Sequence, residues 1–375
     1  MVHAYLNEIG TAVPANESQQ EFLATLESWI PDEAVVNKLR IIAKRSGIER
    51  RHTVLKDVIG APGSGAFYEI GNFPSTAKRM EVYRQEAPGL AVKAARALEA
   101  RGVNLATITH LLITSCTGFY APGLDVDLIR LLTLPRSVHR NIIGFMGCYA
   151  GITGLRNASD IVRANPEARV LMINLELCTL HLQQDAPIDR LVASMLFSDG
   201  CAAALISSQP EGFRLDSFNT ILSLEDADRM EWLVEDQGFA MTLDVEIPNR
   251  IRDFLERDPE LFEDARRDPQ SLWAIHPGGR AILDAVRLAL SLSTEQIVPA
   301  RKILANYGNM SSASVMFVFD ELLRAAPLNE SRPGGAVAFG PGLTLEALEF
   351  TYTPRVSPIC TDLIKHDEAS LVSVI

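Results

Sequence analysis

Short apolar runs alternate with longer amphipathic segments along the chain, which is the pattern of an α/β protein. Residues 87–102 predict a helix, with Pro88 near its start and Gly102 after its end. In residues 149–166 the apolar positions fall on one helical face, and Pro166 ends the helix. The runs that predict buried strands span residues 110–116, 169–177, 201–208, 272–276, 302–308 and 335–340.

A unit of strand, tight turn and helix recurs four times, at residues 111–132, 142–162, 272–292 and 302–323. The spacing within the two pairs is similar, because 32 residues separate Cys116 from Cys148 and 33 separate His276 from Asn309. This similarity predicts two related halves, residues 1–212 and 213–375. Because α/β units are common, chance recurrence is the alternative explanation.

The composition is that of a folded globular enzyme, with 47% hydrophobic and 22% charged residues in a chain of 375. A net charge of −12 gives no support for nucleic-acid binding. Basic residues nevertheless gather in residues 38–52. This cluster fits either a solvated helix face or a site for a phosphate-bearing ligand.

Five cysteines, an odd number without C-x-x-C spacing, predict neither a disulfide framework nor a structural zinc site. The scattered histidines likewise suggest no metal site. The first ten residues lack the basic and apolar regions of a signal peptide, and no run of 18 apolar residues occurs. These features predict a cytoplasmic protein without a membrane span.

Three candidate catalytic residues, Cys148, His276 and Asn309, fall at turns that follow predicted strands. Ligands gather at such turns, and the positive end of a helix dipole favours a cysteine thiolate. A histidine can pair with that thiolate, and an asparagine amide can hold an oxyanion. Each residue alone also fits a structural role: a buried cysteine, a hydrogen-bonded histidine and a capping asparagine. Their equivalent positions together favour chemistry.

Four stretches, "GCYAG", "WAIHPGG", "NYGNMSSASVMFVFDEL" and "AFGPGLTLE", closely resemble the signatures of type III polyketide synthases, the chalcone-synthase-like family. The resemblance extends from about residue 35 to about residue 350, and "TSCTGF" looks like the bacterial branch. It implies a thiolase-like αβαβα fold of five layers built from two halves. It also implies a homodimer in which Cys148, His276 and Asn309 catalyse the reaction.

The implied substrates are an acyl-CoA starter and malonyl-CoA, and no cofactor is expected. Lys38, Arg45 and Arg51 lie in the segment that resembles the family's surface for the CoA phosphates, although Ile41 stands where plant members carry arginine. Phe197, in "LFSDG", corresponds to the family's first gatekeeper phenylalanine. A core aromatic residue is the alternative role for Phe197.

Several departures from the plant enzymes bear on the substrate. Met241 replaces a second gatekeeper phenylalanine, and Cys116 replaces a threonine that lines the cavity. Trp232 falls near a position that holds a small residue in chalcone synthases, and Ala121 replaces a methionine that enters the partner's cavity. They favour an aliphatic starter in a tunnel over a bulky aromatic one, and hence an alkylpyrone or alkylresorcinol product. The remaining positions that the resemblance places near the substrate are Glu176, Cys178, Ser311, Gly340 and Pro341.

Other functions share the same three residues. A single-step ketoacyl synthase that initiates fatty-acid synthesis would add one malonyl unit, and a cysteine hydrolase would release CoA without malonyl-CoA. A non-catalytic acyl-binding relative would form no acyl-enzyme. The "HPGG" and "AFGPGLTLE" stretches favour the type III polyketide synthases over these alternatives.

Overall fold

The computed structural model describes residues 2–17, 19–184, 187–258, 260–325 and 330–354. Its largest element is a nine-stranded sheet in the order β13-β14-β15-β10-β1-β9-β8-β6-β7. Its two halves, β13 to β10 and β1 to β7, join where Tyr5 and Leu6 of β1 pair with β10. The strands are β1 (Tyr5–Ala12), β6 (His110–Ser115), β7 (His139–Gly144), β8 (Val170–Leu177), β9 (Asp199–Ser207), β10 (Gly212–Leu222), β13 (Leu272–Ile275), β14 (Arg332–Gly340) and β15 (Thr344–Thr353).

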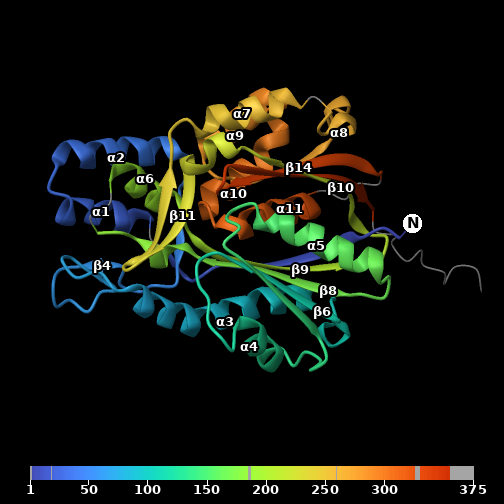
Figure 1. Ribbon diagram of the computed structural model, residues 1–375, viewed down its shortest axis with the longest axis horizontal. Coiled ribbons are helices and arrows are strands. Elements are labelled where there is room, and N and C mark those ends of the chain that lie inside the picture. Colours follow the sequence, from blue (N-terminus) through green and yellow to red (C-terminus); the bar gives the residue numbers. More distant parts are fainter. Residues whose placement is uncertain (1, 18, 185–186, 259, 326–329, 355–375) are drawn as a thin grey trace, which may run out of the picture.

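Helices separate and cover the two halves of the sheet, so the molecule has five layers (Figure 1). The pair α5 (Ala150–Ala164) and α11 (Ser314–Arg324) lies between them. One outer layer contains α3 (Thr76–Ala100) and α4 (Leu124–Leu131). The other contains α7 (Ile247–Arg257) and α9 (Arg280–Ala289), and α10 (Val298–Tyr307) contacts both α9 and α11. Because β8 has helices on both faces, every residue of this strand is buried. This arrangement confirms the expected αβαβα fold.

Smaller elements cover one end of the layers, and three of them surround the site described below. These are helix α2 (Glu33–Ser46), helix α6 (Ile188–Leu196) and the hairpin of β11 (Met230–Glu235) and β12 (Gly238–Leu243). Helix α2 begins where the Asp32 carboxylate accepts hydrogen bonds from two backbone N–H groups, and it ends at Gly47, whose φ is 78°. The remaining elements are α1 (Gln19–Trp29), α8 (Glu263–Arg267), β2 (Asn16–Glu17), β3 (His52–Thr53), β4 (Ile59–Gly60), β5 (Tyr68–Glu69) and the 3₁₀ turns η1 (Leu105–Thr107), η2 (Cys178–His181), η3 (Leu224–Arg229), η4 (Glu295–Ile297) and η5 (Ser311–Ala313).

The structure confirms five of the six predicted strands, within a few residues at their ends, and the predicted helix at residues 149–166. The strand predicted at residues 302–308 is wrong, because this segment is the end of helix α10. The buried residues of α10, Ala300, Ile303 and Leu304, recur at helical spacing, and Gly308 ends the helix with a φ of 66°. Helix α3 also begins earlier than predicted, at Thr76, and continues through Pro88.

No helix in the described part of the chain is long and apolar enough to cross a bilayer.

Candidate active site

Cys148 lies in the turn between β7 and α5, two residues before the helix begins at Ala150. Gly147 turns the chain with a φ of 81°, and a Cβ atom there would lie 2.3 Å from Cδ of Pro341. The backbone N–H of Gly147 donates to Sγ of Cys116 over 3.0 Å, which fixes the turn from the other side. Only glycine fits this position, so the Cys148 side chain is held in a defined place.

His276 and Asn309 reach the same place from the other half of the chain. His276 directly follows β13, and its backbone N–H donates to the carbonyl of Val337 over 2.8 Å. Asn309 follows α10, and its Oδ1 accepts the N–H of Ser311 over 2.9 Å, which turns its NH₂ group away from that bond. Neither ring nitrogen of the buried His276 has a hydrogen-bond partner among the described residues. Cys148, His276 and Asn309 line one cavity together.

Burial dominates the protonation of this site. It raises the pKa of the Cys148 thiol to about 12, although bonds from Ser311 and Asn309 act in the other direction. Burial also lowers the pKa of His276 to about 3. The expected preference for a thiolate at the start of α5 is therefore outweighed by loss of solvent. The free site holds a neutral thiol next to a neutral imidazole at neutral pH.

Two cavities meet at Cys148. The outer cavity has about 1260 Å³ of empty space, open solvent included, and contains the His276 ring and the Asn309 amide. The inner cavity has about 870 Å³ of empty space, again with open solvent included, and its surface is largely apolar. Phe197 and Met241 line both cavities, so they form the partition between the two spaces beside Cys148. These are the two positions that the sequence assigned to gatekeepers.

The hairpin β11–β12 forms one wall of the inner cavity. Nε1–H of Trp232 donates to the carbonyl of Cys116 over 2.7 Å. His181 anchors the next strand, because its Nδ1 accepts the N–H of Phe239 over 3.0 Å and its Nε2 lies 2.8 Å from the Thr117 carbonyl. The His181 ring also stacks on Phe239 with centroids 4.2 Å apart. Sequence reasoning missed His181 and Phe239, because no local pattern indicates that either residue lines the cavity.

Of the other residues expected near the substrate, Cys116, Trp232, Cys178, Ser311 and Pro341 do line the inner cavity. Gly340 lines neither cavity, and a Cβ atom there would lie 2.6 Å from Cδ1 of Tyr149. Contact of Gly340 with substrate stays a prediction, and in this structure the glycine allows close packing against Tyr149.

Glu176 also lies outside both cavities and is fully buried. Its carboxylate accepts hydrogen bonds from the N–H of Cys116 and the hydroxyl of Thr117, both over 2.9 Å, and from the hydroxyl of Ser312 over 2.5 Å. Burial raises the pKa of Glu176 to about 7, partly offset by these bonds. The structure therefore makes Glu176 a support for the turn behind Cys148 and not the expected substrate contact.

The mouth of the outer cavity carries two arginines. Arg45 on α2 and Arg280 at the start of α9 both line this cavity, and both side chains are exposed. Arg280 was not anticipated from the sequence, because it is an isolated basic residue after "HPGG". Lys38 lies exposed on α2, outside the lining. Arg51 is buried against the inner cavity, so its expected contact with the CoA phosphates is wrong.

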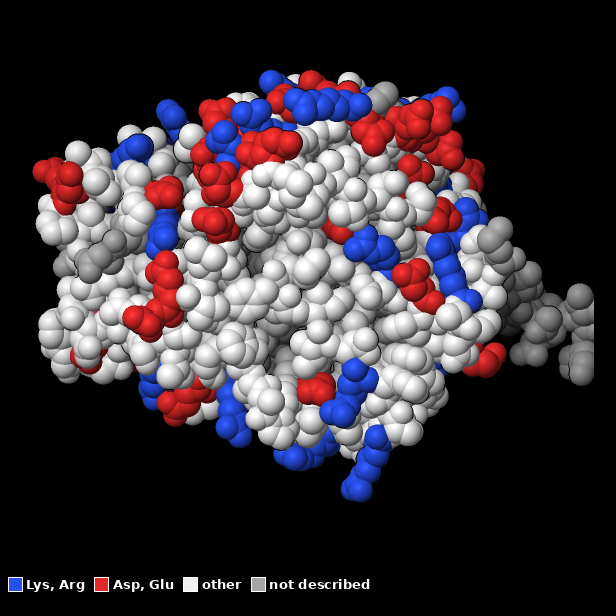
Figure 2. Space-filling view, viewed as in Figure 1, with Lys and Arg blue, Asp and Glu red and all other residues white. Residues whose placement is uncertain are grey.

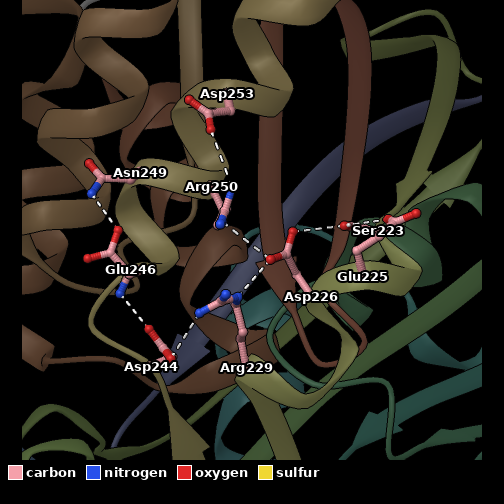
Figure 3. Close-up of polar contacts among 9 residues, drawn as sticks. All are labelled: Ser223, Glu225, Asp226, Arg229, Asp244, Glu246, Asn249, Arg250 and Asp253. Carbon is pink, nitrogen blue, oxygen red and sulfur yellow. Dashed lines mark hydrogen bonds and ion pairs between the residues drawn. The ribbon is translucent and has the colours of Figure 1, made fainter.

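A network of ion pairs holds the lip of the outer cavity (Figure 3). Arg229 donates from Nε to Asp226 over 2.7 Å and from Nη1 to Asp244 over 3.1 Å. Arg250 of α7 approaches the same Asp226 carboxylate at 3.3 Å, and the Ser223 hydroxyl donates to it over 2.9 Å. The network thus joins η3, the end of β12 and α7. It fixes the turn at residues 243–247, which lines the outer cavity.

Comparisons with known proteins agree with this fold and site. The N-terminal domain of chalcone and stilbene synthases matches residues 2–210, and the C-terminal domain of the same family matches residues 217–352. The chain is 31% identical over 362 residues to "Probable polyketide synthase 1" of Dictyostelium discoideum. That match covers 92% of this chain and 11% of the much longer relative.

Two crystal structures are similar over almost their whole length. The C-terminal type III polyketide synthase domain of Steely1, a type I/III hybrid from Dictyostelium, has a TM-score of 0.84 and 29% identity, with 93% of this chain and 99% of that chain covered. PKS-I from the brown alga Ectocarpus siliculosus has a TM-score of 0.84 and 30% identity, with 94% and 99% covered.

The layered fold defines a thiolase-like α/β protein. Within that class, the chain belongs to the chalcone and stilbene synthase family, the type III polyketide synthases.

Proposed function

We propose that the protein loads an acyl-CoA starter on Cys148 and extends it by repeated decarboxylative condensation with malonyl-CoA. The observation that carries this proposal is the meeting of Cys148, His276 and Asn309 at the junction of two cavities. One cavity opens beside Arg45 and Arg280, which suits the phosphates of a CoA thioester. The other is largely apolar and suits a growing acyl chain.

Loading begins with transfer of the Cys148 proton to a ring nitrogen of His276. The thiolate attacks the thioester carbonyl, and the oxyanion accepts hydrogen bonds from the imidazolium and from the NH₂ group of Asn309. The carbon–sulfur bond to CoA then breaks, and the CoA thiolate takes the proton from His276. The acyl group remains on Cys148, facing the inner cavity.

Extension uses the same hydrogen-bond donors, His276 and Asn309, to stabilise the negative charge of an enolate. The carbon–carbon bond between C2 of malonyl-CoA and its carboxylate breaks, CO₂ leaves, and the electron pair becomes an enolate whose oxygen is held by His276 and Asn309. C2 of the enolate attacks the acyl carbon, and the Cys148 thiolate departs. The product is a β-ketoacyl-CoA two carbons longer, which can reload Cys148. The apolar inner wall limits access of water to the acyl-enzyme.

The inner cavity supports an aliphatic starter. Phe22, Val58, Leu182 and Ala193 extend its apolar surface away from Cys148, toward α1 and α6. Trp232 occupies part of the space beside the nucleophile, as its bond to the Cys116 carbonyl requires. Apolar surface of this kind suits an aliphatic acyl chain. Lactonisation of the extended chain gives an alkylpyrone, and aldol closure gives an alkylresorcinol.

We also propose that two copies pair through β7, in the cytoplasm, where CoA thioesters are available. Strand β7 is an edge of the large sheet, and its residues 139–142 are exposed. Ile142 is 55% exposed and Phe119 is 57% exposed, and the Phe119 ring lies 6.0 Å from that of Phe145. Figure 2 shows few charged side chains in the middle of one face of the molecule and many along its upper rim. An unpaired strand edge that exposes Ile142 is suited to pairing with a second copy.

Light scattering tests the pairing. Ile142→Asp is expected to give a monomer at concentrations where the unchanged chain is a dimer. Val298→Asp is the matched control, because Val298 is 50% exposed at the start of α10. Equal masses for the two variants would refute pairing through β7.

Products formed from malonyl-CoA and acyl-CoAs of graded length test the reaction itself. Long acyl-CoAs are expected to give cyclic products with two or more added malonyl units, and Cys148→Ala is expected to give none. Addition of a single malonyl unit would indicate a ketoacyl synthase. CoA release without malonyl-CoA would indicate a hydrolase, and absence of any acyl mass on Cys148 would indicate a non-catalytic relative.

A further inference from the structure

Arg51 is a buried cation beside the partition between the two cavities. The residue is 2% exposed and lines the inner cavity. Its Nη1 donates to the carbonyl of Ser194 over 2.7 Å and to the carbonyl of Phe197 over 2.8 Å. Its Nε donates to Oε1 of Gln19, and the guanidinium lies 5.0 Å from the centre of the Phe22 ring. Nη1 thus serves the two carbonyls near Phe197, whereas the buried Nη2 has no hydrogen-bond partner among the described residues.

The two carbonyls that Arg51 holds belong to the last turn of α6 and its C-terminal cap. Carbonyls at a helix end have no partner within the helix, and a cation there also interacts favourably with the helix dipole. Burial lowers the pKa of Arg51 to about 10, opposed by the charge of Asp199, so the side chain remains protonated at neutral pH. The guanidinium therefore supplies both charge and hydrogen bonds to the end of α6.

The backbone on either side of Phe197 is tied to Asn309. Ser198 N–H donates to the Asn309 carbonyl over 2.9 Å, and Asn309 N–H donates to the Leu196 carbonyl over 2.8 Å. The Ser198 hydroxyl also accepts the N–H of His52 over 2.7 Å. These contacts secure Asn309 and the chain on both sides of Phe197 without Arg51. The carbonyl of Phe197 itself is the group that depends on the guanidinium.

We propose that Arg51 is a positioning residue that holds Phe197 in the partition, so that extension depends on Arg51 much more than loading does. The inference rests on the proposed function. Loading needs Cys148 and the oxyanion donors, none of which contacts the guanidinium. Extension also needs the malonyl group and the acyl-enzyme aligned across the partition, where a displacement of about 1 Å can lower the rate about a hundredfold.

Two substitutions at Arg51 and one at Ser198 test the proposal. Arg51→Met removes both N–H donors to the carbonyls of Ser194 and Phe197. Arg51→Lys keeps the charge, but its shorter side chain loses the Nε donor to Gln19 and places its ammonium differently from Nη1, so it is expected to rescue in part. Ser198→Ala removes the tie to His52 and changes little volume. Arg50→Met is the matched control, because Arg50 is the neighbouring arginine but its side chain is half exposed.

Two rates are compared for each variant: acylation of Cys148 by an acyl-CoA, followed by mass spectrometry, and extension by malonyl-CoA. Arg51→Met is expected to lower kcat for extension at least about tenfold, with the starter KM and the acylation rate within about threefold of the unchanged chain. For Arg51→Lys, kcat for extension is expected to lie between the values of the unchanged chain and of Arg51→Met. Ser198→Ala is expected to lower kcat for extension as well, and Arg50→Met to match the unchanged chain.

Equal losses of acylation and extension in parallel with the melting temperature would overturn the proposal, since they would indicate a purely structural role. Unchanged extension in Arg51→Met would overturn it as well. If Arg51→Met does not fold, Arg51→Lys decides the question by the same ratio of rates. Failure of the unchanged chain to load or extend would instead contradict the proposed function.

Discussion

His181 is a buried histidine whose neighbours fix its protonation state. Its Nδ1 faces the N–H of Phe239, so this nitrogen must carry a lone pair, and the proton lies on Nε2, which donates to the Thr117 carbonyl. Burial is the main cause that lowers the pKa of His181 from its ordinary 6.5 to about 3, and the charge of Arg79 acts in the same direction. As the pH is lowered, His181 therefore gains a proton in the unfolded chain at a much higher pH than in the folded chain.

The sign of the effect follows from proton counting. Between pH 6.5 and pH 3 the unfolded chain binds a proton at His181 that the folded chain does not. The stabilising contribution of the neutral ring is therefore complete above pH 6.5 and is lost as the pH falls through this window. At about pH 5 the loss is about 2 kcal/mol, and the equally shifted His276 adds about the same amount.

His181→Gln tests this reasoning, because a glutamine amide can accept from the Phe239 N–H and donate to the Thr117 carbonyl without titrating. The free energy of unfolding is measured with urea at about pH 7.5 and about pH 5. The variant is expected to lose about 2 kcal/mol less than the unchanged chain between these conditions. His3→Gln, at an exposed histidine, is the control and should change nothing. Equal pH dependence in His181→Gln and the unchanged chain would refute the reasoning.

Three further substitutions have expected outcomes. Gly147→Ala places a Cβ atom 2.3 Å from Cδ of Pro341. It is expected to reduce the rate of Cys148 acylation more than about a hundredfold. Gly144→Ala is the control in the same assay and should be tolerated, because its nearest contact would be at 3.8 Å. Arg280→Ala is expected to raise KM for acyl-CoA about tenfold with kcat unchanged, while KM for a pantetheine thioester without phosphates stays constant in steady-state kinetics. Glu176→Gln removes a carboxyl whose raised pKa disfavours folding as the pH rises from about 4.5 to about 7. The free energy of unfolding, measured with urea, is expected to fall across that pH range by about 3 kcal/mol less in the variant than in the unchanged chain. An equal fall in both proteins would contradict the raised pKa of Glu176.

The sequence was most informative where a short local pattern determines the structure. The glycines around Cys148 and the apolar strands before Cys148 and His276 predicted turns at the ends of strands, and the structure has those turns. The motifs then identified which turn residues belong together. The meeting of Cys148, His276 and Asn309 in one cavity follows from the order of the layers, which the family resemblance supplied.

Local patterns failed where distant contacts decide the outcome. Residues 302–308 are apolar enough for a strand, but burial of Ile303 and Leu304 on one face of α10 favours a helix. Arg51 lies in a basic run and was assigned to the surface. Its true environment is created by carbonyls of Ser194 and Phe197, more than a hundred residues away in the chain. No spacing within the basic run distinguishes this buried arginine from its exposed neighbours.

The division of the site into two cavities separates two properties that many enzymes combine in one pocket: the room for the bound chain and the position of the reacting side chains. The inner wall opposite the triad comes from the hairpin β11–β12 and from η2, which carry none of the three reacting side chains. A substitution in these elements alters the room available to the bound chain and leaves the bond-forming atoms in place. Descendants of such a protein can therefore diverge in product size through wall residues alone, with the chemistry of each condensation preserved.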